Sequence, residues 1–127
     1  MGASQRFFKC ELCGNLTGLI LNKGVPLSCC GQNMTELIPN TVDAAKEKHL
    51  PSVNVKTGEI EVQVGSVPHP MDEGHHITFV YVETAEGGQR KRLKTGADPK
   101  CAFSFVNDKP VSVFAYCNLH GLWKTEL

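Results

Sequence analysis

Four of the six cysteines lie within the first 30 residues, and their spacing constrains the fold of this segment more than any other feature. Cys10 and Cys13 form a Cys-x2-Cys turn, and the adjacent pair Cys29–Cys30 follows after 15 residues. A Cys-x2-Cys turn directs two thiolates at one point, so the four sulfurs can complete a tetrahedral metal site. Units of fewer than about 40 residues usually need a metal or disulfides to fold. We therefore predict that residues 1–37 form a small domain stabilised by a metal.

The spacing of these cysteines does not choose between zinc and iron, because both metals accept four thiolates. A common zinc ribbon uses two Cys-x2-Cys turns. Here two consecutive cysteines must twist against the alternation of a strand to reach one ion, which favours a distorted tetrahedron. A disulfide pairing is less favoured, because closely spaced cysteines in a cytoplasmic protein are more often metal ligands. A zinc site that only holds the segment together remains an alternative.

Composition and charge exclude two classes of partner. The chain of 127 residues carries 13 Lys and Arg against 13 Asp and Glu, so it lacks the excess positive charge on which tight nucleic-acid binding depends. No apolar run approaches the roughly 20 residues that span a bilayer. The first eight residues lack the apolar core of a signal peptide. We expect a cytoplasmic protein with neither nucleic acid nor membrane as partner.

The rest of the chain, residues 38–127, has the pattern of a β-sandwich. Residues 53–55 and 60–64 alternate apolar and polar side chains around a Thr57–Gly58 turn, which predicts a hairpin with one buried face. Residues 77–83 are apolar at nearly every position and predict a central strand. Further strands are expected at 90–94, which is basic, and at 102–106 and 111–116. Some seven short strands predict an all-β protein with an immunoglobulin-like sandwich. Helical periodicity is weak and confined to residues 42–47.

A second group of possible metal ligands ends the last apolar strand. In Cys117-x2-His120 one tight turn can offer a thiolate and an imidazole to a single ion. Cys117 continues the strand face that carries Val111, Val113 and Ala115, so we expect its sulfur at the inner edge of the sandwich.

The other histidines lie at expected strand ends. They are His49, His69 and the adjacent pair His75–His76. Each alone fits an ordinary surface or loop role, but their grouping around a thiol is less easily explained by chance. Four imidazoles and a thiolate exceed the four ligands usual for zinc. Five ligands with an open sixth position suit a redox-active iron, onto which the thiolate pushes electron density.

Together these motifs resemble those of the desulfoferrodoxin family, the two-iron superoxide reductases, over essentially the whole chain. The matching positions are Cys10, Cys13, Cys29, Cys30, Glu47–Lys48–His49-x-Pro51, His69–Pro70–Met71, His75 and Cys117–Asn118-x-His120–Gly121. The resemblance implies a desulforedoxin-like domain at 1–37, whose cysteines bind a distorted rubredoxin-like iron. It implies a neelaredoxin-like superoxide reductase domain at 38–127.

The resemblance also implies the ligands of the second iron. His49, His69, His75 and His120 would form its equatorial plane, with Cys117 as the axial ligand. Neighbouring strand residues point to opposite faces, so only one of His75 and His76 is expected to serve. The spacing found in the family selects His75.

The activity implied is the one-electron reduction of superoxide to hydrogen peroxide, with two protons consumed. Glu47 resembles the carboxylate that can occupy the sixth position of the ferric resting state, and Lys48 resembles the cation that attracts the anion. Otherwise the two residues would be a solvated charged pair. The implied partners are superoxide, an electron donor such as rubredoxin and a second copy of the chain in a homodimer.

Some alternatives stay open at this stage. A two-iron electron carrier without catalytic turnover would use the same ligands, although an open coordination position argues against it. The basic run at 90–94 is either a solvated strand face or a docking site for an acidic donor. Cys101 belongs to neither group and is expected to be a buried, inert thiol.

Overall fold

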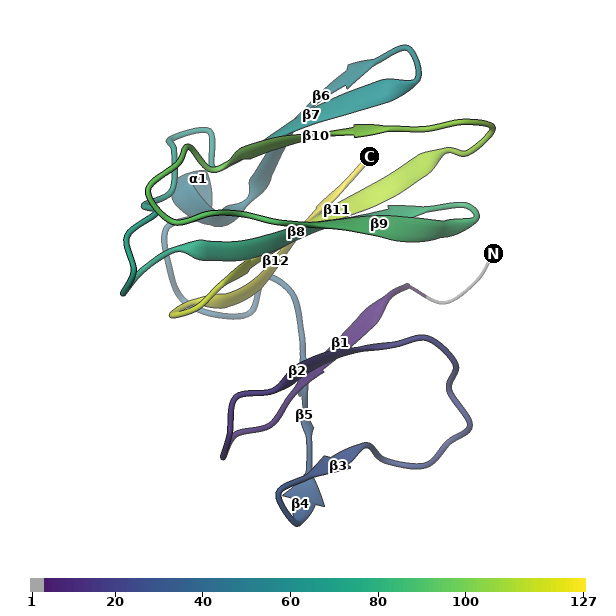
Figure 1. The fold of residues 1–127 in the computed structure, drawn as a ribbon, viewed down its shortest axis with the longest axis vertical. Helices are drawn as coiled ribbons and strands as arrows, with labels where there is room; N and C mark the ends of the chain where they lie inside the picture. The colour runs from purple at the N-terminus through teal and green to yellow at the C-terminus, as the bar shows by residue number, and fades with distance from the viewer. Residues whose placement is uncertain (1–3) are drawn as a thin grey trace. The chain divides into compact units, whose positions relative to one another are not determined.

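The chain divides into two compact units, Met1–Ile38 and Pro39–Leu127, and the computed structural model describes residues 4–127 (Figure 1). In the first unit, β1 (Arg6–Lys9) lies between β2 (Leu16–Leu19) and β5 (Thr35–Leu37) in an antiparallel sheet. The strands β3 (Ser28–Cys29) and β4 (Gln32–Asn33) form a separate two-stranded ladder.

The first unit has little apolar core. Its buried hydrophobic side chains are Phe7 and Cys10, as far as residues 4–38 are described. The Arg6 guanidinium donates two hydrogen bonds, of 2.8 and 3.0 Å, to the Glu36 carboxylate across β1 and β5. An exposed pair of this kind adds little stability. The stability of this unit therefore depends mainly on the link between its four cysteines.

The adjacent cysteines reach one point because Cys29 ends a strand and Cys30 lies in the tight hairpin turn that follows it. Ser28 pairs with Asn33 and Cys29 with Gln32, which leaves Cys30 and Gly31 as a two-residue turn. Their φ angles are 54° and 77°, as a type I′ turn requires at both central positions. Cys30 is thus in a left-handed conformation. This conformation breaks the alternation of the strand, as we expected for two consecutive ligands of one ion.

The second unit is a sandwich of seven strands, as the sequence predicted (Figure 1). One sheet has the order β10-β7-β6 and the other β12-β11-β8-β9. The bounds are β6 Pro51–Lys56, β7 Glu59–Val64, β8 Ile77–Thr84, β9 Gly87–Arg92, β10 Lys100–Ser104, β11 Pro110–Cys117 and β12 Gly121–Glu126. The core between the sheets is apolar and includes Ile60, Val80, Phe103, Val113 and Cys117.

Three local predictions differ from the structure. The helix α1 is one turn, Lys46–His49, rather than residues 42–47, and it has no side-chain cap. β10 ends at Ser104, so Val106 is exposed. Val111 is also exposed, because the register of β11 against β8 shifts between Pro110 and Ser112 and leaves Val111 without a partner in that ladder.

The turns that carry the candidate ligands meet at one end of the sandwich. In Figure 1 these are α1, the connection before β8 and the turn between β11 and β12, all at the left. The hairpins β6–β7 and β8–β9 and the turn before β11 lie at the opposite end. In residues 4–127 no helix is both long and apolar enough to cross a membrane.

Candidate metal centres

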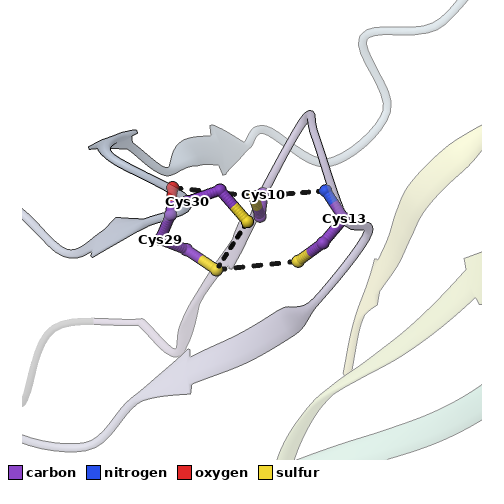
Figure 2. A group of neighbouring side chains, drawn as sticks. All are labelled: Cys10, Cys13, Cys29 and Cys30. Carbon is purple, nitrogen blue, oxygen red and sulfur yellow. Dashed lines mark hydrogen bonds between the residues drawn. The ribbon is translucent and has the colours of Figure 1, made fainter.

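The four cysteines of the first unit converge on a common space (Figure 2). Their sulfurs all lie within 4.8 Å of one another. The Cys13 and Cys29 sulfurs are 3.6 Å apart, and those of Cys29 and Cys30 are 3.9 Å apart. These separations suit four sulfurs around one ion at the usual metal–sulfur distance of about 2.3 Å.

Backbone N–H groups around this cluster favour negative charge on the sulfurs. The amide of Cys13 lies 3.4 Å from the Cys10 sulfur, and the amide of Asn15 lies 3.5 Å from the Cys13 sulfur. The N–H bond from Cys13 is the main cause that lowers the pKa of Cys10 to about 6. The neighbouring sulfurs of Cys13 and Cys10 raise the pKa of Cys30 to about 12. A cation among the four sulfurs would offset the mutual repulsion of their negative charges, so this site fits a thiolate-bound metal.

A second cluster lies at the end of the sandwich. One ligand atom from each of His49, His69, His75 and Cys117 lies within 4.8 Å of all the others. His49 ends α1, His69 and His75 belong to the connection between β7 and β8, and Cys117 ends β11. His120 adjoins this group, with its Nδ1 3.1 Å from His49 Nε2 and 3.8 Å from the Cys117 sulfur.

Backbone carbonyls decide which nitrogen two of these imidazoles present to the cluster. His49 Nδ1 lies 2.7 Å from Ala45 O, and His69 Nδ1 lies 2.7 Å from Pro70 O. A carbonyl oxygen only accepts, so each Nδ1 carries the proton and each Nε2 keeps its lone pair. His120 differs, because its Nδ1 is the nitrogen that faces His49 and Cys117.

Two nitrogens of the cluster are buried without a hydrogen-bond partner in the structure. They are Nε2 of His69 and Nε2 of His75. A buried polar atom without a partner costs roughly 1–3 kcal/mol, so such atoms normally have a function. Both belong to the same cluster of imidazoles, and a bound cation would satisfy both at once. This observation is the strongest indication in the second unit that the residues fit a metal.

Three of the imidazoles, those of His49, His69 and His75, favour the neutral form that metal ligands need. Burial, reinforced by the neighbouring imidazoles, lowers the pKa of His69 to about 4. Burial also lowers the pKa of His49 and of His75. The positive charge of Lys48 makes a small contribution to the lowered pKa of both His49 and His75.

Cys117 is fully buried, and burial raises the pKa of its thiol. The backbone N–H of His120 donates to its sulfur over 3.4 Å and partly offsets this effect. The pairing of β11 with β8 shifts again between Tyr116 and Cys117, which sets Cys117 opposite Ile77 at the rim of the core. A buried thiolate surrounded by neutral imidazoles is stable only beside a cation.

Sequence analysis gave no role to two residues that hold these ligands: Trp123, and Asn118 of the Cys117–Asn118-x-His120 motif. The Trp123 ring stacks on His49 with centroids 4.9 Å apart, and its Nε1 donates to His120 O over 3.1 Å. The Asn118 side chain accepts from His76 N and donates to Gly74 O, which ties the loop around His75 to the turn after Cys117. The only available signal was their position: Trp123 is the single tryptophan and follows His120 by three residues.

The remaining sequence-predicted residues lie as follows. His76 Nδ1 bonds Asp72 O at 3.0 Å, and the four-residue group contains His75 and not His76. Glu47 and Lys48 are exposed on α1, and Glu47 O accepts a hydrogen bond from Val67 N. Cys101 is half-buried rather than buried, and burial raises the pKa of its thiol to about 11, so it is a poor nucleophile.

The fold and the two clusters define a class of protein: an oxidoreductase with two non-haem iron centres, one held by sulfur alone and one by four imidazoles and a thiolate. The chain belongs to the desulfoferrodoxin family. The model of that family matches residues 41–126, and the model of its N-terminal domain matches residues 3–37.

Individual relatives agree with this assignment. The desulfoferrodoxin of Syntrophotalea carbinolica is 42% identical over 126 residues, which are 99% of this chain and 99% of the relative. The crystal structure of the superoxide reductase from Treponema pallidum covers 98% of this chain and 100% of its own, with a TM-score of 0.82 and 35% identity. The superoxide reductase (1Fe-SOR) from Giardia intestinalis covers 65% of this chain and 100% of its own, with a TM-score of 0.54 and 30% identity.

Removal of one cysteine should abolish iron binding at the first centre and leave the second centre intact. Cys13→Ser replaces an exposed member of the four-sulfur cluster, so we expect purified protein to fall from two irons per chain to about one, because an alcohol oxygen is a poor substitute for a thiolate. Metal analysis with an absorption spectrum measures this loss. Cys101→Ser is the matched control and should keep both irons. Equal iron content in the two variants would contradict the assignment of the first centre.

Proposed function

We propose that the chain is a superoxide reductase, which converts superoxide, one electron and two protons into hydrogen peroxide. The observation that carries this proposal is the cluster of four imidazoles and one thiol, in which the Nε2 atoms of His69 and His75 are buried and unpaired. Two solved structures to which the chain is similar, from Treponema pallidum and Giardia intestinalis, are superoxide reductases and support the same activity.

We assign each centre to one unit. Cys10, Cys13, Cys29 and Cys30 would hold one iron, and His49, His69, His75, His120 and Cys117 would hold the other. A ferrous ion held by the second set would supply the electron that superoxide accepts. The set offers five donors, one fewer than an octahedral ion takes, so one position would be open to the substrate. The Giardia intestinalis relative is a 1Fe-SOR whose whole chain matches 65% of this chain. It supports placing the reaction in the second unit.

The protein's own residues prepare this position before the substrate arrives. Ala45 O and Pro70 O hold the tautomers of His49 and His69, and the His120 N–H holds negative charge on the Cys117 sulfur. These groups are already oriented in the fold, so little reorganisation is needed when the charge at the centre changes. The field of Lys48 attracts the anion, whereas the exposed Glu47 carboxylate on the same turn opposes it and competes for the open position.

The alternative from a different class is a two-iron electron carrier. It would use the same ligands, but it would have no need for a cation whose field reaches the imidazoles. The two functions differ in their products, since a carrier passes electrons to a partner without consuming superoxide.

Product stoichiometry tests the proposed function. With an electron donor present, the iron-loaded protein should yield one hydrogen peroxide per superoxide and no dioxygen, because every superoxide is reduced. Pulse radiolysis with an oxygen electrode and a peroxide assay measures both products. Release of one dioxygen for every two superoxide ions would indicate a dismutase. No consumption above the spontaneous rate would leave the carrier as the better interpretation.

Two substitutions on α1 test the charges around the open position. Lys48→Ala should lower the second-order rate constant with superoxide by about threefold to tenfold at low ionic strength and weaken its salt dependence, because steering of an anion depends on nearby positive charge. Glu47→Gln should act in the opposite direction. Lys109→Ala removes an exposed lysine at the other end of the sandwich and serves as the control. Equal salt dependence in all variants would remove Lys48 from the mechanism.

We further propose cytoplasmic location, an acidic electron donor such as rubredoxin and a homodimer. The six free cysteines support a reducing compartment. The exposed Arg90 and Arg92 of β9 offer a positive surface to the donor.

In the first unit Ile20 and Val25 are 99% and 76% exposed, and such apolar surface favours association of two chains. Sedimentation of the iron-loaded protein should give twice the mass of one chain, and a monomer at all concentrations would exclude the dimer.

A further inference from the structure

The segment Gly65–Val67, which follows β7, is bonded to the turn that carries Glu47, Lys48 and His49. Gly65 N donates to Leu50 O over 3.1 Å, and Val67 N donates to Glu47 O over 2.9 Å. The Ser66 hydroxyl adds a bond of 3.3 Å to Glu47 O. These three bonds bracket Lys48 and His49 from both sides along the chain.

The turn itself has few other restraints. α1 is a single turn with no side-chain cap at its start, and its internal bonds are Lys48 N to Ala45 O at 3.2 Å and Leu50 N to Lys46 O at 2.9 Å. Isolated helices of this length are unstable in water. The His49 side chain holds the end of the turn through its bond to Ala45 O and its stacking on Trp123. Apart from these contacts, the position of the Lys48 backbone depends on the Gly65–Val67 segment.

Only glycine fits at position 65. Its φ is +83°, a conformation that residues with a Cβ rarely adopt. A Cβ built there would lie 2.6 Å from Lys48 O, 2.8 Å from the Lys48 carbonyl carbon and 2.2 Å from Val67 O. All three are backbone atoms, which cannot rotate away as the end of a side chain can. A side chain at position 65 would therefore push the Lys48 peptide away from β7.

The same segment leads to a second ligand of the cluster. His69 N donates to Val64 O over 3.0 Å, so the chain turns back on the end of β7 directly after Gly65–Val67. β7 is an inner strand of its sheet, with β6 and β10 on either side. It thus provides a rigid base from which Gly65 can set the distance of the Lys48 turn.

We propose that Gly65 is a positioning residue that sets the place of Lys48 at the open side of the centre through close backbone contact. The role of Lys48 in this proposal rests on the proposed reaction with superoxide. The contact between Gly65 and the Lys48 carbonyl does not rest on that reaction and can be tested separately.

The chain contains a matched control for the substitution. Gly96 has the same φ of +83°, but a Cβ there would meet nothing within 4 Å. Gly65→Ala and Gly96→Ala therefore share the backbone strain, and only Gly65→Ala introduces the contacts with Val67 O and the Lys48 carbonyl. A difference between the two variants therefore reports these contacts, and its appearance in residues 44–50 reports their effect on the Lys48 turn.

The first readout is independent of activity. Hydrogen exchange of the amides in residues 44–50, measured on the iron-loaded protein by mass spectrometry, should be at least about tenfold faster in Gly65→Ala than in Gly96→Ala, because exchange follows local opening. Equal exchange in the two variants would overturn the proposal, whether or not the protein reduces superoxide.

The second readout is the reaction with superoxide. Gly65→Ala should lower the rate constant at low salt by about threefold to tenfold and weaken its salt dependence as Lys48→Ala does, with Gly96→Ala unchanged. Combined with Lys48→Ala, Gly65→Ala should have little additional effect, since both act through one charge. Additive effects would contradict a role through Lys48. If the wild-type protein does not reduce superoxide, the proposed function is refuted, but the hydrogen-exchange test of the Gly65 contact remains valid.

If Gly65→Ala does not fold, Ser66→Ala tests the same segment. It removes one hydrogen bond to Glu47 O and introduces no clash. It should raise the exchange of residues 44–50 and weaken the salt dependence in the same direction. Wild-type values in both measurements would overturn the proposal.

Discussion

The second unit depends on a cluster of four imidazoles and a thiol at one end of a β-sandwich, in which His49, His69 and Cys117 are buried. Burial lowers the pKa of His49, His69 and His75, and it leaves two Nε2 atoms without a hydrogen-bond partner. Such an arrangement costs free energy in the absence of a cation and becomes favourable when one is bound. We therefore expect a bound metal to stabilise the turns around the cluster.

The two units bring their metal ligands together in different ways. In the first, two turns and few buried side chains bring four sulfurs together, so the metal replaces a core. In the second, the apolar core between two sheets fixes the strand ends, and ligands from separate turns meet there. Backbone carbonyls, Trp123 and Asn118 then orient the imidazoles. The second centre can leave a position open because its geometry does not depend on the metal alone.

Much of this could be predicted from local patterns. Alternating residues at 60–64 and the apolar run at 77–83 predicted strands, because one buried face imposes a period of two. The Cys-x2-Cys and Cys-x2-His turns predicted ligands, since short spacings bring donors together whatever the fold. The one-turn helix at Lys46–His49 and the exposed Val111 were not predicted. Both depend on bonds or register with strands distant in the sequence, which no local pattern records.

The amino-acid sequence by itself determined which donor atoms are available and that they lie in turns and at the ends of strands. Chemical identity and short-range spacing are properties of the chain. Only the tertiary structure decided that His120 Nδ1 faces His49, that Trp123 stacks on His49, and that position 65 admits no side chain. These depend on distances between segments up to about 70 residues apart, which become defined only when the two sheets pack against each other.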